Sequence, residues 1–462
     1  MTPLRTLLLA AAPLVLGACA ASAPPASVAP VLPAQWQAPL PHNGKLGDLS
    51  QWWRGQGDPL LAQLIEAAQQ VNPSVAAAQS RIAQSRAERV AASAALLPSL
   101  DAAASVSRAS QQSALPGGTT SQIALQSSWE LDLFGARRAG RTAAQARLAG
   151  AEAGWHEARV SVAAEVANQY YGLRACEQLL VVARQDAASR ADTARLTDLS
   201  AKAGFQAPAT AALARASAAE GNARAVGQRA LCELDIKALT ALTGLDEPAL
   251  RARLAAAPAL PAPPLSIPQL PAQLLAQRPD VFNAEREVAA ASADVGAARA
   301  QRYPRLALQG SVGLGNFRGG GESVTLDTWS IGPLALTVPI FNAGRLAANV
   351  DAAGARYDAA VVNYRASARQ AVSEVEQALV NLDSSTARIA DARVAMEGYL
   401  LAFHGAEDRY KNGMASLLEL EETRRLRLAA DNAAVTLQRE RNLAWVALYR
   451  AAGGGWTRGG AN

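Results

Sequence analysis

The chain has few of the side chains that build catalytic or metal sites. Its 462 residues include three cysteines and three histidines, and aromatic residues make up 5% of the sequence. His42, His156 and His404 are far apart and lack the spacing of metal ligands. No phosphate-binding loop, nucleophile elbow or paired-carboxylate motif stands in a suitable context. We therefore expect no enzyme activity, no cofactor and no metal site.

Charge of one sign is also scarce. The formal net charge is +5, and arginines alternate with acidic residues along the chain instead of forming a basic block. This mixture is typical of solvated helix faces, so we expect no nucleic-acid partner. Half of the residues are hydrophobic although few are aromatic. Such a composition favours long helices that pack closely through small side chains.

The first nineteen residues have the pattern of an export signal. Arg5 supplies a positive charge and residues 7–16 form an apolar run. This run is too short to cross a bilayer. The segment ends in Leu16-Gly17-Ala18-Cys19, which is similar to the bacterial lipobox. That similarity implies cleavage before Cys19 and its lipidation, and Ala20 in place of an aspartate points to the outer membrane. An ordinary signal peptide with an incidental cysteine is the alternative.

The most informative pattern is a unit that occurs twice. Asn72-Pro73 opens a helical stretch that closes at Pro98, and Arg278-Pro279 opens another that closes at Pro304. Proline suits the first turn of a helix and ends a helix further along. Within each unit the two prolines are 25 positions apart, and the units start about 206 residues apart. Later pairs keep an offset of 207 to 209: Phe134 and Phe341, Glu165 and Glu374, Gly204 and Gly413. We predict an internally duplicated fold.

After each unit the period of the apolar residues changes to two, which predicts strands. Apolar and polar positions alternate in about 99–133, with loop Gln111–Thr120, and in about 305–341, with loop Asn316–Ser323. The clearest strand has Ile123, Leu125, Trp129, Leu131 and Leu133 on one face and Ala124, Gln126, Ser128, Glu130 and Asp132 on the other. The last strand is expected to hold Leu334, Leu336, Val338 and Ile340. A soluble sandwich has the same alternation, but a polar face with two acids suits a membrane barrel around a wet lumen.

A very long helix follows each pair of strands. The first runs from after Gly135 to about Ser200, which is on the order of 95 Å at ~1.5 Å per residue. Gly204 breaks it, and Gly413 breaks its counterpart in the second half. The second long helix carries a coiled-coil stripe at Val361, Tyr364, Ala368, Val372, Val375, Leu379 and Leu382. Each half is therefore expected to be helix, two strands, long helix, glycine break and helix.

These patterns predict six segments. They are a signal peptide (1–18), a lipidated tether (19–50), a first repeat (51–245), a Pro-rich linker (246–270), a second repeat (271–452) and a flexible C-terminal tail (453–462).

The order and spacing of several motifs resemble the TolC family of outer-membrane efflux factors, and most closely its OprM-like or NodT-type lipoprotein branch. The motifs are Asp58-Pro59-Leu60-Leu61, Asn72-Pro73, Leu97-Pro98-Ser99-Leu100, Trp129-Glu130-Leu131-Asp132-Leu133-Phe134-Gly135, Pro339-Ile340-Phe341-Asn342-Ala343-Gly344-Arg345 and Tyr410-Lys411-Asn412-Gly413. The resemblance implies a mainly α fold with a membrane β-barrel, in which a homotrimer forms a 12-stranded barrel, four strands per chain, continued by a coiled-coil α-barrel. Four strands alone could not close around a channel, and open strand edges are not viable in lipid.

The resemblance also implies a function. Such a protein is a passive exit duct anchored in outer-membrane lipid. It docks through a periplasmic adaptor (membrane fusion) protein onto an inner-membrane pump, and the pump exports drugs or other small toxic compounds through the duct. Pro98 and Pro304 would then mark the barrel boundary, and Gly204 and Gly413 the far ends of the helix hairpins. Two alternatives stay open: an exit channel for protein secretion or metal efflux, and a periplasmic coiled-coil structural lipoprotein.

In the family, the constricting residues lie five, six and nine positions beyond the second hairpin glycine. Here these positions hold Leu418, Glu419 and Glu422. A trimer would form a leucine ring beside acidic rings, which would favour cations. The alternative is a solvated acidic face near a helix N-terminus. An acid–arginine lock of some relatives is expected to be absent, because Thr210 and Ala415 occupy its two positions.

Two cysteines could face each other across the first hairpin. The midpoint between Cys176 and Cys232 is position 204, the glycine break. If the two helices fold back there, both cysteines lie at the same height, and the periplasm is oxidising. The rotation of the helices is not known from the sequence. A disulfide and two buried free thiols therefore both remain open.

Overall fold

The computed structural model describes residues 22–30, 32–38, 52–55, 58–110, 117–256, 277–456 and 458. The signal segment, Cys19 and residues 257–276 lie outside these ranges. Two compact units are present. The first comprises residues 1–30, 79–153 and 282–367, and the second comprises 31–78, 154–281 and 368–462. None of the described helices combines the length and the apolarity needed to cross a membrane.

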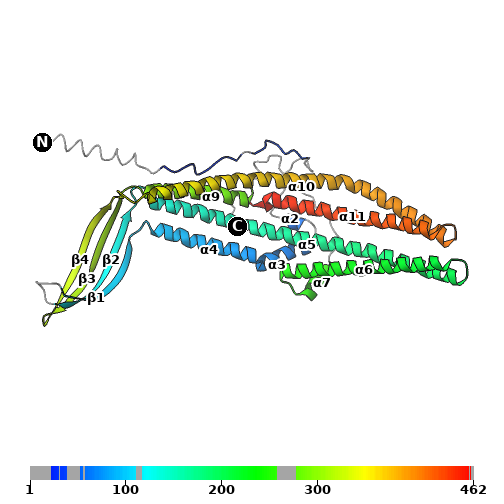
Figure 1. Cartoon of the computed structure of the whole chain (residues 1–462), viewed down its shortest axis with the longest axis horizontal. Helices are drawn as coiled ribbons and strands as arrows, with labels where there is room; N and C mark the ends of the chain where they lie inside the picture. Colours follow the sequence, from blue (N-terminus) through cyan, green and yellow to red (C-terminus); the bar gives the residue numbers. More distant parts are fainter. Residues whose placement is uncertain are drawn as a thin grey trace. The chain divides into compact units, whose positions relative to one another are not determined.

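The first unit contains one four-stranded antiparallel sheet, in the order β1-β2-β3-β4 (Figure 1). Its strands are β1 (Ser99–Ala109), β2 (Gly118–Leu131), β3 (Arg305–Gly319) and β4 (Glu322–Thr337). Each repeat thus supplies one hairpin, as the sequence predicts. Strands β1 and β4 are the two edges and pair with no further strand among the described residues.

The sheet carries many large apolar side chains on its surface. Ile123 lies opposite Leu314, and Leu125 lies opposite Val312. All four side chains are exposed. The other exposed large apolar residues of the strands are Leu100, Val106, Val324, Leu326, Trp329, Ile331, Leu334 and Leu336. An apolar surface of this extent usually contacts lipid or another chain.

The strand ends differ from those predicted. The loop expected at Asn316–Ser323 is only a two-residue turn, Gly320-Gly321, with φ of 63° and 89°. Because two glycines accept this left-handed backbone, β3 and β4 pair up to the turn. The last strand was expected to include Val338 and Ile340, but β4 ends at Thr337. Pro339 between them has no N–H for a ladder bond.

The helices repeat almost residue for residue. Helices α4 (Pro73–Ala94) and α9 (Pro279–Ala300) both have 22 residues. Helices α5 (Ala136–Lys202) and α10 (Arg345–Lys411) both have 67 residues. Helices α6 (Pro208–Thr243) and α11 (Leu417–Ala451) have 36 and 35 residues. The predicted duplication is therefore present in these three pairs of helices.

Local signals explain where several helices start and stop. The Asp58 carboxylate accepts hydrogen bonds from the backbone N–H groups of Leu60 and Leu61, which starts α3 (Pro59–Val71). Gly244 has φ of 65° and ends α6. Pro98 and Pro304 each follow a helix end and directly precede a strand.

The second unit contains the main apolar core. From α5 it includes the predicted helical stripe of Val162, Val166, Tyr170 and Leu173, all buried. From α10 it includes the second half of the predicted coiled-coil stripe, and Ala368, Val375, Leu379 and Leu382 are buried. The short helix α2 (Trp52–Gly55) adds Trp52, whose ring stacks on Tyr449 at 4.8 Å between centroids.

Two segments expected to lack regular structure are ordered parts of this unit. The Pro-rich linker was predicted from 246, but α7 (Glu247–Ala256) occupies its start and buries Leu250 and Leu254. The C-terminal tail was predicted to be flexible from 453, but Gly453–Gly455 forms the 3-10 helix η2. A Cβ on Gly453 would lie 2.2 Å from the Gln277 carbonyl oxygen, so only glycine fits there. Tyr449 Oη donates to the Gly454 carbonyl oxygen at 3.3 Å, a further contact that a Gly-rich sequence does not indicate.

Candidate functional site

Two helix hairpins in the second unit carry the predicted gate. The first hairpin (residues 154–243) turns at Gly204, and the second hairpin (residues 368–451) turns at Gly413. The two glycines have φ of 81° and 72°. Past each glycine, one amide donates back into the last helical turn: Phe205 N to Ser200 O at 2.9 Å, and Met414 N to Arg409 O at 2.8 Å. Both turns are thus the glycine-dependent helix cap.

The predicted constriction residues lie in the first two turns of α11. The Ser416 side chain caps this helix by accepting from the Glu419 backbone N–H at 3.2 Å. Leu418 is 75% exposed, so its side chain is available to a neighbouring chain or a lumen. Glu419 and Glu422 are also accessible, and each pairs with an arginine of the same hairpin.

These arginines change the expected electrostatics. Glu419 forms an ion pair with Arg409 at the end of α10. Glu422 accepts from Arg425 at 2.6 Å, and this hydrogen bond holds the pKa of the Glu422 carboxyl below its usual range. Each carboxylate is therefore paired with a positive charge of its own hairpin. The expectation of acidic rings did not take these two arginines into account. The sequence contains a signal for one of them, because Arg425 follows Glu422 by three positions, a spacing that favours pairing on a helix.

The positions of the lock found in some relatives are uncharged. Thr210 lies in the first turn of α6, and Ala415 lies in the turn that precedes α11. Neither side chain can form an ion pair. The contacts that hold the two hairpins together must come from other residues.

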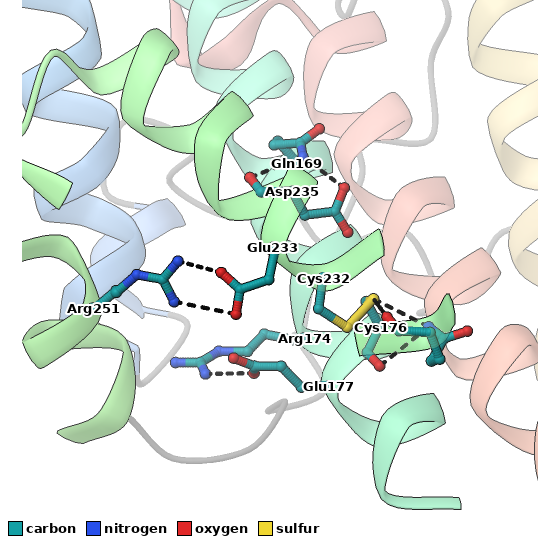
Figure 2. Close-up of a disulfide and its surroundings, with 9 residues drawn as sticks. Gln169, Arg174, Cys176, Glu177, Cys232, Glu233, Asp235 and Arg251 are labelled. Carbon is teal, nitrogen blue, oxygen red and sulfur yellow. Dashed lines mark hydrogen bonds and ion pairs between the residues drawn. A yellow bond between two sulfur atoms is a disulfide. The ribbon is translucent and has the colours of Figure 1, made fainter. Parts of the chain in front are cut away.

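A disulfide joins the two helices of the first hairpin. Cys176 of α5 and Cys232 of α6 are bonded, with their Cα atoms 5.5 Å apart (Figure 2). The structure thus has the bridge and not the two free thiols that the sequence also allowed. The Gln228 amide lies beside it and donates to the Cys176 carbonyl oxygen at 3.4 Å. Ion pairs flank the bridge, including Arg174 with Glu177 at 2.8 Å.

The segment that follows Cys19 lies against helices of the first unit. Ser292 Oγ donates to the Pro24 carbonyl oxygen at 2.5 Å. Tyr357 Oη donates to the Pro25 carbonyl oxygen at 2.9 Å. Arg299 Nη1 donates to Ser22 Oγ at 3.2 Å. The chain is therefore fixed on α9 three residues after the predicted lipidation site.

Aromatic contacts stabilise the places where helices give way to strands. Trp129 Nε1 donates to the Leu96 carbonyl oxygen at 3.0 Å, next to Pro98. Tyr303 precedes Pro304, and its ring stacks on Phe134 at 4.8 Å between centroids. Both predicted boundary prolines thus lie beside a packed aromatic side chain.

Chemically, the hairpin end offers charge pairs and apolar side chains. Within the described ranges, no group of three or more His, Cys, Asp or Glu side chains is arranged to hold a metal ion. These ion pairs and exposed apolar side chains are suited to contacts between helices that can form and break.

Comparison with known proteins gives consistent similarities. A family model described as outer membrane efflux protein matches residues 64–245 and 270–454. The pyoverdine export outer membrane protein OpmQ of Pseudomonas aeruginosa is 31% identical, over 98% of this chain and 97% of its own. Outer membrane protein OprJ of the same organism is 32% identical, over 96% of this chain and 95% of its own. The solved outer-membrane channel OprN has a TM-score of 0.84 at 28% identity, over 94% of this chain and 99% of that one.

Proposed function

The chain belongs to the outer membrane efflux protein family, the TolC family, and from this we propose that three copies form one exit duct. It is an outer-membrane efflux channel and not an enzyme. In the proposed assembly, three four-stranded sheets close one twelve-stranded barrel, and the hairpins form its periplasmic tube. An adaptor protein connects the tube to an inner-membrane pump, which supplies drugs or other small toxic compounds.

One observation carries the assembly. The sheet has two edge strands without partners among the described residues and an exposed apolar face. A sheet with open edges cannot lie in lipid, because each unpaired backbone group costs several kcal/mol there. Pairing of β4 with β1 of the next copy satisfies both edges, and three copies reach a strand number that can enclose water.

The position of the N-terminal segment supports lipidation at Cys19. Ser22 lies three positions after Cys19, so the chain between their Cα atoms reaches at most about 11 Å. Ser22 is held by Arg299, six residues before strand β3 starts. An acyl chain on Cys19 would therefore enter the membrane close to the helix–strand boundary at Pro304.

Channel recording tests the duct. The purified full-length lipoprotein should run as an SDS-resistant trimer that dissociates on heating, and it should conduct ions in planar bilayers. A monomer without conductance, soluble once the lipid is removed, would refute the channel and favour a structural lipoprotein.

We also propose that the periplasmic end of the duct is closed by a gate on α11. Leu418, Glu419 and Glu422 line the constriction, and replacing both glutamates by alanine raises conductance and antibiotic leakage. Since Arg409 and Arg425 neutralise these acids, cation preference should be modest in the native channel. Unchanged conductance and leakage in the double variant would exclude these residues as the constriction.

A further inference from the structure

A buried cluster of charges connects the two hairpins. It consists of Asp186 and Arg190 on α5 and Glu421 and Arg424 on α11. Their side chains are 6%, 9%, 19% and 2% exposed, respectively. We name these four residues the cross-hairpin cluster. Ionised groups are rarely buried unless they are paired.

Arg190 is the centre on the first hairpin. Its Nε lies 3.0 and 2.9 Å from the two Asp186 carboxylate oxygens. Its Nη1 donates to Glu421 Oε2 at 2.5 Å and to Ser217 Oγ of α6 at 2.5 Å. Ser217 also donates to the same Glu421 oxygen at 3.1 Å. Glu421 thus contacts both helices of the first hairpin.

Arg424 of the second hairpin contacts helix α5 of the first hairpin. It forms an ion pair with the other Glu421 oxygen, Oε1. Its Nη2 donates to Thr193 Oγ1 at 2.8 Å and to Ser189 Oγ at 3.2 Å, both on α5. Its guanidinium lies 5.6 Å from the ring centroid of Phe403 on α10. The cluster therefore ties together all four helices of the two hairpins.

The first hairpin provides space for this arrangement. Gly221 of α6 is buried against α5, and a Cβ there would lie 2.8 Å from Arg190 Cδ. A larger residue at 221 would push Arg190 away from Glu421. Arg224, one turn further, donates to Asp186 Oδ2 at 3.2 Å and completes the neutralisation of that acid.

Helix α11 carries the cluster and the proposed constriction on different faces. Leu417, Glu421 and Arg424 follow the three- and four-residue spacing of one helix face, and this face is turned inward. Leu418 and Glu422 lie four residues apart on a neighbouring, exposed face. Since a helix moves as a rigid element, displacing the exposed face also displaces Glu421 and Arg424.

We propose that the cross-hairpin cluster holds the second hairpin against the first, and that Glu421 and Arg424 are positioning residues of the gate. This rests on the proposed channel function. Opening of the tube end by the second hairpin breaks the Arg190–Glu421 contact, so this contact sets the resting population of the open state. The charged pair takes the place of the lock that Thr210 and Ala415 cannot form.

The central experiment is Glu421→Gln in the full-length trimer. The amide keeps the shape of the side chain but removes the negative charge shared by Arg190 and Arg424, and Arg190 keeps only Asp186. We expect resting conductance and antibiotic leakage to rise about tenfold, which corresponds to ~1.4 kcal/mol. Arg190→Gln should have the same effect from the other hairpin. The double variant should add little, because both single changes remove one contact.

The matched control is Glu440→Gln. Glu440 lies on the same helix and pairs with Arg388 at 3.2 Å, but this pair is exposed and lies within the second hairpin. Its loss should leave conductance unchanged. Hydrogen exchange gives a readout that needs no channel activity. Amides of residues 417–427 should exchange faster in Glu421→Gln and at the native rate in Glu440→Gln.

The outcomes separate the two proposals. A native protein that forms no trimer and does not conduct refutes the duct, while hydrogen exchange still tests the cluster. A conducting native protein whose Glu421→Gln variant matches Glu440→Gln in conductance and exchange refutes the cluster alone. A lower trimer dissociation temperature that accompanies the conductance rise would show a general structural role and would also overturn it. If Glu421→Gln does not assemble, Ser217→Ala and Thr193→Ala each remove one hydrogen bond, and no rise in leakage from either refutes the proposal.

Discussion

Replacing Cys176 and Cys232 together by alanine should loosen the first hairpin and leave the second unchanged. Alanine suits both positions, because the two cysteines are buried to 6% and 5% exposure. The neighbouring hydrogen bond from Gln228 to the Cys176 carbonyl oxygen involves the backbone and survives the substitution. The change therefore removes the covalent link with little loss of packing.

The size of the effect follows from the loop that the bridge closes. The two cysteines are 56 residues apart, and this loop contains the whole far end of the first hairpin. In the chain-entropy account, a link across a loop of this length stabilises by about 4 kcal/mol relative to the open chain. For openings that unfold both helices, this corresponds to exchange that is roughly 10³-fold faster.

Hydrogen exchange of the trimer in detergent measures this directly. Amides of α6 that exchange only when the hairpin unfolds should lose protection in the double variant, and equally in the native protein with reductant. The second hairpin serves as the internal control. At the equivalent positions, 209 residues further along, it has Ser385 and Arg441 and no bridge.

Two results would refute this reasoning. Equal protection of α6 with and without the bridge would mean that helix packing alone decides the opening free energy. Full alkylation of both cysteines in denatured, unreduced protein would mean that the bridge does not form.

Three further predictions concern single positions. Partial desolvation and the nearby Asp280 carboxylate raise the pKa of Glu157 above its ordinary value of 4.5 although the residue is exposed, so its contribution to stability falls as the pH rises above that value; Glu157→Gln should slightly raise the trimer dissociation temperature at pH 7 and change it little at pH 4. Gly413→Ala should destabilise the second hairpin by about 1–2 kcal/mol in urea titrations, because φ is 72° at this position; the added Cβ would meet no other atom, so backbone strain is the whole effect. Gly398→Ala inside α10 should instead stabilise the hairpin by up to ~1 kcal/mol. Arg299→Ala should release Ser22, and limited proteolysis with mass spectrometry should then show faster cleavage before residue 30.

Much of the fold could be predicted because its signals are local. Pro73 and Pro279 start helices, Pro98 and Pro304 precede strands, and the repeat shows that both halves follow one plan. Helices with a clear three- and four-residue stripe were placed within a few residues of their ends. The duplication made the prediction of helices and strands easier, because the same pattern of residues occurs in both halves of the sequence.

The errors have a common physical cause, which is contact between residues distant in sequence. Residues next to Gly320-Gly321 looked like a loop by composition, but pairing with the opposite strand extends β3 and β4 to the turn. Helix α7 has a proper start at Asp246-Glu247-Pro248, yet its proline-rich surroundings hid this signal. Gly453 packs closely against the backbone of Gln277, a contact that the sequence cannot reveal.

The site was predictable only in part. The family resemblance proposes Leu418, Glu419 and Glu422 as the constriction, which stays a prediction, and it does not indicate the arginines that pair with the two acids. The contact between Arg190 and Glu421 joins residues 231 positions apart. It depends on how each helix is rotated about its axis, and apolar periodicity alone does not determine which polar side chains meet.

The disulfide between Cys176 and Cys232 also bears on how the protein is made. If Cys19 is acylated as the sequence predicts, the rest of the sequence holds two thiols, and two thiols allow one intrachain pairing. Oxidation then needs an oxidant but no isomerase, because no wrong intrachain bridge exists to be corrected. The remaining hazard is a bridge between chains. Cys176 is synthesised 56 residues before its partner, an interval of roughly 3–11 s at ~5–20 residues per second. Until Cys232 has also reached the periplasm, an exported Cys176 can react only with another molecule.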